Sequence, residues 1–191
     1  FSYFSLLAAR QALARHGLAL FDVEELPTHG GSLRVYAGHE GERKPVSAAV
    51  EKLLAAERQA GLDRVETYAA FQAKVREAKW RLVEFLVAAR RAGKRVAGYG
   101  AAAKGNTLLN YCGIGGDLVE FVADASPHKQ GKFLPGTHIP VVAPEQVRAA
   151  RPAYLLILAW NLADEIMGKM GHIRQWGGRF VLPVPAPSEI A

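Results

Sequence analysis

The stretch KRVAGYGAAAKGNTLLNYCG, Lys94–Gly113, decides the fold of this chain. It begins with an apolar run typical of a buried strand, turns at Gly98 and Gly100, and continues as a helical pattern. A strand, a glycine turn and a helix in this order are typical of the first unit of a nucleotide-binding α/β domain, in which the helix N-terminus favours an anion. The stretch therefore predicts a ligand-binding turn.

Strand and helix patterns alternate from residue 93 onward, which predicts a parallel sheet with right-handed crossovers. Strands are expected at 94–99, 118–123, 153–159 and 178–182, and helices at 101–111, 144–150 and 162–175. The predicted fold class is α/β, a Rossmann-like parallel sheet flanked by helices. The segment 124–141 is expected to be a long polar loop, and the tail PVPAPSEIA is expected to be irregular.

The sequence before this domain predicts a small helix–hairpin unit and a long helical segment. A helix is expected at 5–15 and a hairpin with strands at 18–25 and 32–37, a unit too small to bury a core alone. Residues 45–91 have a helical pattern that Gly61 interrupts. Seven apolar side chains of the second helix share one face, which predicts burial in the core. They are Val65, Tyr68, Phe71, Val75, Leu82, Phe85 and Leu86.

Composition indicates a globular protein, because half of the 191 residues are hydrophobic. The net charge is +6, and the basic residues are spread along the chain, so we expect a solvated basic surface and no nucleic-acid partner. No apolar run has the length of a membrane span. The single cysteine, Cys112, suits a cytoplasmic location and is expected to be buried filler. No CxxC or HExxH pattern predicts a zinc site.

The glycine turn matches one nucleotide-binding pattern in part. GYGAAA fits GxGxxA, and Asp124 follows the second strand, where an acid contacts ribose hydroxyls. The P-loop pattern is absent, and a tight turn without a ligand remains the alternative. Lys104 and its neighbours add donors at the first turn of the helix. The candidate substrate-binding residues at this edge are Gly98, Tyr99, Gly100, Lys104, Asn106, Thr107, Asp124, His128, Lys132 and Asn161.

Two of these candidates, His128 and Lys132, come from the polar loop after the second strand, which is expected to lie over the same face. Lys129 and Lys132 would contact phosphate and His128 a sugar or base, with a solvated basic loop as the alternative. Asn161 follows the strand at 153–159, and capping of the next helix is its more common role.

Five segments together resemble the C-terminal part of the S-adenosylmethionine-dependent sugar C-methyltransferases, which methylate a carbon of a nucleotide-linked deoxysugar. They are FSYFSL, THGGSLRVYA, GYGAAAKGNTLLNY, ADASPHKQGKFLPGTHIPV and ILAWN. The resemblance covers nearly the whole chain. It implies that residues 1–38 are the C-terminal remnant of a methyltransferase domain, that 39–92 form a helical linker, and that 93–191 form a Rossmann-like domain that helps enclose the nucleotide-sugar substrate.

The resemblance also implies that the methyl-donor site, the zinc cysteines and a Glu-His pair carrying the general base lie upstream of this chain. We therefore expect this piece to bind no cofactor and to be inactive alone. The hairpin tip would lie near the cleft, which makes His29, Ser32 and Arg34 candidate catalytic contributors, although such a turn is often only a turn. A stand-alone module binding NAD or a nucleotide sugar, and a structural domain with an empty turn, remain alternatives.

Overall fold

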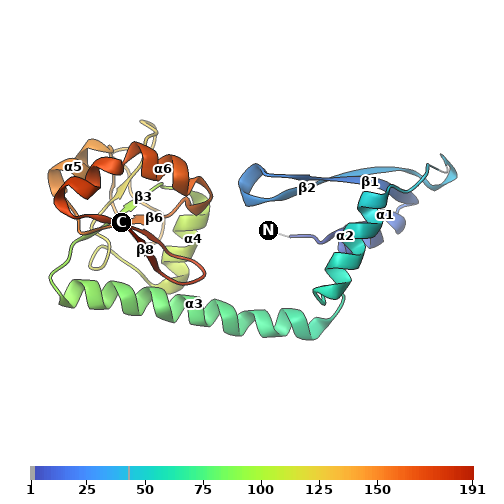
Figure 1. The fold of residues 1–191 in the computed structure, drawn as a ribbon, viewed down its shortest axis with the longest axis horizontal. Coiled ribbons are helices and arrows are strands. Elements are labelled where there is room, and N and C mark those ends of the chain that lie inside the picture. The colour runs from blue at the N-terminus through green and yellow to red at the C-terminus, as the bar shows by residue number, and fades with distance from the viewer. Residues whose placement is uncertain (1–2, 43) are drawn as a thin grey trace. The chain divides into compact units, whose positions relative to one another are not determined.

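A computed structural model describes residues 3–42 and 44–191 of the chain. These residues form two compact units, which divide between residues 73 and 74, inside the helix α3 (Val65–Arg91). Figure 1 shows the chain coloured from its N-terminus to its C-terminus. The domain boundaries expected at residues 38 and 92 stay predictions, because the two compact units are defined by their internal packing, whereas the expected boundaries follow from the family resemblance.

The first unit contains the predicted helix and hairpin. Helix α1 (Leu6–Ala14) precedes strands β1 (Leu18–Leu26) and β2 (Ser32–His39), which pair antiparallel with a bulge between Leu20 and Asp22. Two 3₁₀ helices, η1 (Thr28–Gly30) and η2 (Glu40–Glu42), follow the strands. Helix α2 (Ala48–Gln59) completes the unit. The hairpin prediction is confirmed.

The packing partner that this small unit needs is α2. Its Leu54 is buried together with Leu6 of α1 and Leu20 of β1. The buried carboxylate of Glu57, also on α2, accepts hydrogen bonds from the backbone N–H groups of Leu6 at 2.7 Å and Leu7 at 2.8 Å. These two donors have no partner inside α1, so Glu57 caps the helix from a neighbouring element.

The second unit is built on a six-stranded sheet in the order β5-β4-β3-β6-β7-β8. The strands from β5 to β7 are parallel, and β8 is antiparallel to β7. The strands are β3 (Val96–Tyr99), β4 (Val122–Ala123), β5 (Val141–Val142), β6 (Tyr154–Ile157), β7 (Arg179–Leu182) and β8 (Ser188–Ile190). This order reverses direction between β3 and β6, as in doubly wound nucleotide-binding sheets, so the Rossmann-like prediction is confirmed.

Helices cover both faces of this sheet (Figure 1). Helix α4 (Ala103–Cys112) and the second half of α3 pack on one face, and Cys112 is buried there as expected. Burial raises the pKa of its thiol, which favours an inert side chain. The other face carries α5 (Glu145–Ala150) and, in place of one helix at 162–175, η3 (Trp160–Leu162), α6 (Ala163–Lys169) and η4 (Gly171–Trp176).

Three sequence-based boundaries in this unit are wrong. The strand expected at 118–123 is shorter, because the N–H groups of Leu118 and Val119 both bond to the carbonyl of Gly115 and form a turn. The loop expected at 124–141 ends in β5. The tail expected to be irregular forms β8, because residues 183–187 turn the chain back so that it pairs with β7 at the sheet edge.

The buried face predicted for the long helix is only half correct. Leu82 and Leu86 of α3 are fully buried under the sheet. Val65, Tyr68 and Phe71 are exposed by 74%, 55% and 62%, because no described residue covers the first half of α3. Among the described helices, including this one, none combines the length and the apolar character needed to cross a bilayer.

Candidate functional site

The glycine turn after β3 is tightly packed against β4 and β6. A Cβ on Gly98 would lie 2.9 Å from Val122, and one on Gly105 would lie 2.6 Å from Cβ of Leu158. Gly100 has φ +92°, which disfavours other residues. Gly105, which lies outside the GxGxxA pattern, thus allows the close helix–sheet approach that the third position of that pattern normally provides. Packing accounts for these three glycines without a ligand.

Asp124, at the end of β4, fastens the turn to the loop that follows it. Its buried carboxylate accepts hydrogen bonds from the N–H groups of Ala101 at 2.7 Å and Ser126 at 2.8 Å, and from Nζ of Lys129 at 3.1 Å. Lys129 also donates to the carbonyl of Ala101 at 3.0 Å. The ribose contact predicted for Asp124 would compete with these internal bonds.

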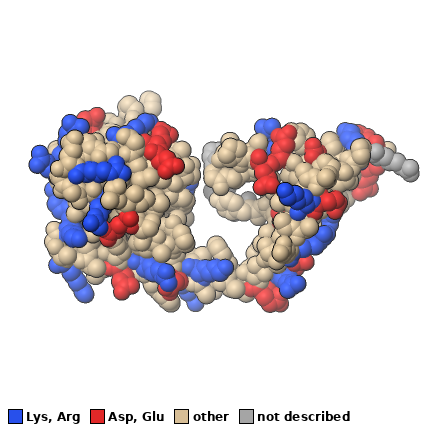
Figure 2. All heavy atoms as spheres, viewed as in Figure 1, with Lys and Arg blue, Asp and Glu red and all other residues tan. Residues whose placement is uncertain are grey.

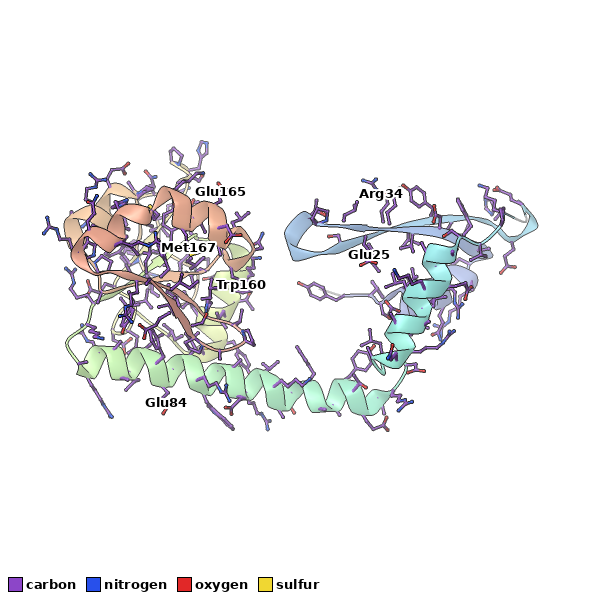
Figure 3. The ribbon with its side chains drawn as sticks, viewed as in Figure 1. Glu25, Arg34, Glu84, Trp160, Glu165 and Met167 are labelled. Atoms are coloured by element: carbon purple, nitrogen blue, oxygen red, sulfur yellow. The ribbon has the colours of Figure 1, made fainter. Side chains whose placement is uncertain are left out.

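The first turn of α4 is the part of the site that favours an anion. Its N-cap, Ala102, has no side chain that can accept from the helix N–H groups. Lys104 places Nζ 4.9 Å from the ring centroid of Trp160, which follows β6 (Figure 3). No ion pair to Lys104 occurs within the described residues. Positive charge and uncapped N–H groups therefore lie between β3 and β6, where the strand order reverses.

The other candidates on α4 bond within the protein. The hydroxyl of Thr107 donates to the carbonyl of Ala103 at 3.0 Å. The side-chain oxygen of Asn106 accepts from Nδ2 of Asn110 at 3.3 Å, and the same nitrogen donates to the carbonyl of Pro135 at 3.0 Å. Asn110 thus holds the loop after β4 against α4.

The candidates in the two loops are exposed. His128 and Lys132 make no side-chain hydrogen bond to any described residue. Asn161 lies exposed in η3, and the capping role expected for it is wrong, since Leu162 is the N-cap of α6 and no side chain bonds to that end. All three side chains remain accessible to a ligand.

The hairpin tip belongs to the first unit and is held by its own bonds. The hydroxyl of Ser32 donates to the carbonyl of Thr28 at 3.0 Å, and Nη1 of Arg34 lies 3.0 Å from Oε2 of Glu24 on the opposite strand. Figure 3 shows Arg34 and Glu25 projecting from opposite faces of the hairpin. His29 lies in η1, but its side chain is outside the described part of the chain. Catalytic contributions from these residues stay predictions.

A pocket of about 590 Å³ lies between α5 and α6. Of its lining residues, Tyr99 is a sequence-based candidate, whereas Arg148, Lys169 and His172 are not. No motif marks these three residues, although Lys169 and His172 are close in sequence at the end of a predicted helix. The pocket therefore depends on how α5 and α6 cover the sheet, which periodicity alone does not specify.

Charged side chains of both signs are mixed on the face of the second unit that Figure 2 shows. Within residues 3–42 and 44–191, no three His, Cys, Asp or Glu side chains form a group suited to a metal ion.

A family model described as the C-methyltransferase C-terminal domain matches residues 27–185. The C-methyltransferase NovU of Streptomyces niveus is 40% identical over 191 residues, which is 100% of this chain and 46% of NovU. The chain therefore spans slightly less than half the length of this relative.

Proposed function

Since the chain belongs to the C-methyltransferase C-terminal domain family, we propose that it is the substrate-side part of an S-adenosylmethionine-dependent enzyme that methylates a carbon of a nucleotide-linked deoxysugar. The match over residues 27–185 and the name of the relative support the methyltransferase assignment. The five sequence segments that together resemble the sugar C-methyltransferases support the nucleotide-sugar substrate.

The observation that carries this proposal is the anion-favouring edge formed by α4 and Lys104. A nucleotide-linked sugar carries a diphosphate, and uncapped helix N–H groups with a lysine are a common way to bind one. The Trp160 ring holds the Lys104 ammonium near this edge. In this proposal the chain binds and orients the substrate.

We propose no methyl-donor site in the described residues of the Rossmann-like unit. In such a sheet the donor ribose would need the acid after the second strand, and here Asp124 already accepts from Ala101, Ser126 and Lys129. We propose that the methyl donor, and the base that removes a substrate proton, are held outside the described residues, as the family resemblance implies.

The test is calorimetric titration of the chain with dTDP at low ionic strength. We expect Lys104→Gln to weaken binding about 5- to 10-fold, because it removes one partly exposed charge-assisted contact. Lys52→Gln, an exposed site on α2, makes the same change of net charge and should leave the affinity unchanged.

Equal weakening in the two variants would show only a general charge effect and would contradict the assigned site. Absence of dTDP binding to the wild-type chain would contradict it as well. Tighter binding of NAD than of dTDP would instead favour a dinucleotide-binding module.

A further inference from the structure

Helix α3 carries one apolar face along most of its length, but only the second half of that face is covered. Leu82 and Leu86 pack against the sheet of the second unit. Tyr68, Phe71 and Val75 precede them at spacings of three, four and seven residues, which keeps all five side chains on one face of a helix. The stripe formed by Tyr68, Phe71 and Val75 therefore continues a face that the protein already uses for packing.

The aromatic rings of this stripe are exposed but held in place. Tyr68 and Phe71 are 55% and 62% exposed, and Val65, one turn earlier, is 74% exposed. The hydroxyl of Tyr68 donates a hydrogen bond to the carbonyl of Leu62 at 2.7 Å, which fixes the ring at the start of the helix. Single exposed apolar side chains are common, whereas a contiguous apolar patch with ordered rings marks an interaction surface.

The charges of α3 are sorted around this stripe. At about 100° per residue, Lys74 and Arg76 border the stripe on its two sides, whereas Glu66, Glu77 and Glu84 lie on the opposite side of the helix. Figure 3 shows Glu84 projecting away from the sheet. Neither Lys74 nor Arg76 makes an ion pair within the part of the chain that the structure describes. The stripe therefore suits an apolar partner surface whose border carries carboxylates.

A second copy of the chain is a poor partner for the stripe. The stripe offers roughly 300 Å² of apolar surface, which is below the roughly 800 Å² per partner of a stable interface. A two-fold axis through the stripe would also bring the cationic border of each copy against the same border of the other. Area and charge thus both favour a different occupant.

We propose that the stripe docks onto residues of the same protein that precede this chain, through an apolar surface bordered by carboxylates. NovU contains enough further sequence for such a surface, because this chain spans 46% of it, and the matching family model describes a C-terminal domain. The second half of the α3 face already packs inside the chain, so the first half would extend one continuous interface. The inference goes beyond the proposed function, because it needs neither the methyl donor nor the sugar substrate.

The test compares how fast a cysteine on the stripe reacts with iodoacetamide in this chain alone and in the longer protein that contains it. Phe71→Cys reports on the stripe. Trp80→Cys is the matched control, because Trp80 is 61% exposed and lies nine residues later, on the opposite side of α3. The native Cys112 is buried and its pKa is raised, so it reacts slowly. Mass spectrometry of the labelled peptides gives each rate.

We expect the thiol of Phe71→Cys to react at least about 10-fold more slowly in the longer protein than in the chain alone, because it reacts only when the contact opens. The thiol of Trp80→Cys should react at similar rates in both. Val75→Cys keeps both rings of the stripe and should be protected in the same way. Adding Lys74→Glu to Val75→Cys should restore part of the rate, whereas adding Lys52→Glu on α2 should not.

Three results would overturn the proposal. The first is an equal rate for Val75→Cys in the two proteins. The second is equal effects of Lys74→Glu and Lys52→Glu, since the partner border would then carry no carboxylates. The third comes from sedimentation of the wild-type chain: a dimer that Phe71→Ala abolishes and Trp80→Ala preserves would show that a second copy covers the stripe. No substrate enters these measurements, so failure of the proposed function leaves their result intact.

Discussion

Removing the Asp124 carboxylate should detach the glycine turn from the loop after β4. Asp124→Ala leaves the N–H groups of Ala101 and Ser126 without their acceptor and Lys129 without its ion-pair partner. Lys129→Met removes only the ion pair and the bond from Lys129 to the Ala101 carbonyl. The two variants therefore separate the backbone contacts of Asp124 from its charge pairing.

The magnitudes differ enough to decide between these roles. A hydrogen bond to a charged group contributes about 1.5–3 kcal/mol. The Ala101 and Ser126 N–H groups are only partly buried, so water replaces some of the loss, and we expect Asp124→Ala to cost about 2–4 kcal/mol in total. The side chain of Lys129 is 46% exposed, and such ion pairs contribute about 0–1 kcal/mol, which sets the expected cost of Lys129→Met.

Urea unfolding followed by tryptophan fluorescence measures both variants. All three tryptophans, Trp80, Trp160 and Trp176, lie in the second unit, so the signal reports on the unit that contains Asp124. A decrease in the free energy of unfolding below about 1 kcal/mol for Asp124→Ala, or equal decreases for the two variants, would refute the conclusion that the Asp124 carboxylate holds the glycine turn to the loop after β4.

Two further predictions concern packing and pH. Gly105→Ala should destabilise the chain by about 1–2 kcal/mol, because a strained contact with Leu158 outweighs the gain of roughly 1 kcal/mol in helix propensity. Gly168→Ala on α6 should stabilise the chain, because a Cβ there would contact nothing. Urea midpoints test both variants. Burial lowers the pKa of His172 in the folded state, so its contribution to the free energy of unfolding should be complete above pH 6.5 and should decrease as the pH falls below that value. The urea midpoint of the wild-type chain should therefore be lower at pH 5.5 than at pH 7.5. His172→Gln should make this difference smaller, because it removes the titrating group.

The parallel sheet was predictable because its longer strands carry their own signal. The residues of β3 and β6 are buried on both faces, so their sequences are continuous apolar runs bounded by turns. The strand β8 had no such signal, since the prolines that precede it mark a turn and its pairing depends on β7. Local patterns therefore identify central strands better than edge strands.

Burial of one helix face was less predictable than its helicity. The apolar periodicity of α3 is continuous from Val65 to Leu86, yet only the part near Leu82 and Leu86 is buried by described residues. Periodicity predicts which side chains share a face, but burial needs a partner that the helix sequence does not specify. The same limit explains why Glu57, which caps α1 from α2, had no sequence signal.

The GxGxxA pattern correctly predicted a tight strand–turn–helix unit at Gly98–Gly100, but packing within the protein accounts for its glycines without a ligand. Its glycines are explained by close packing on Val122, Ala159 and Leu158, and its acid binds the turn itself. A match to a nucleotide-binding pattern can thus report the geometry of a strand–turn–helix unit without reporting its ligand. The case for an anion depends instead on Lys104 and Trp160, which come from segments far apart in the sequence and meet only because β3 and β6 are neighbours.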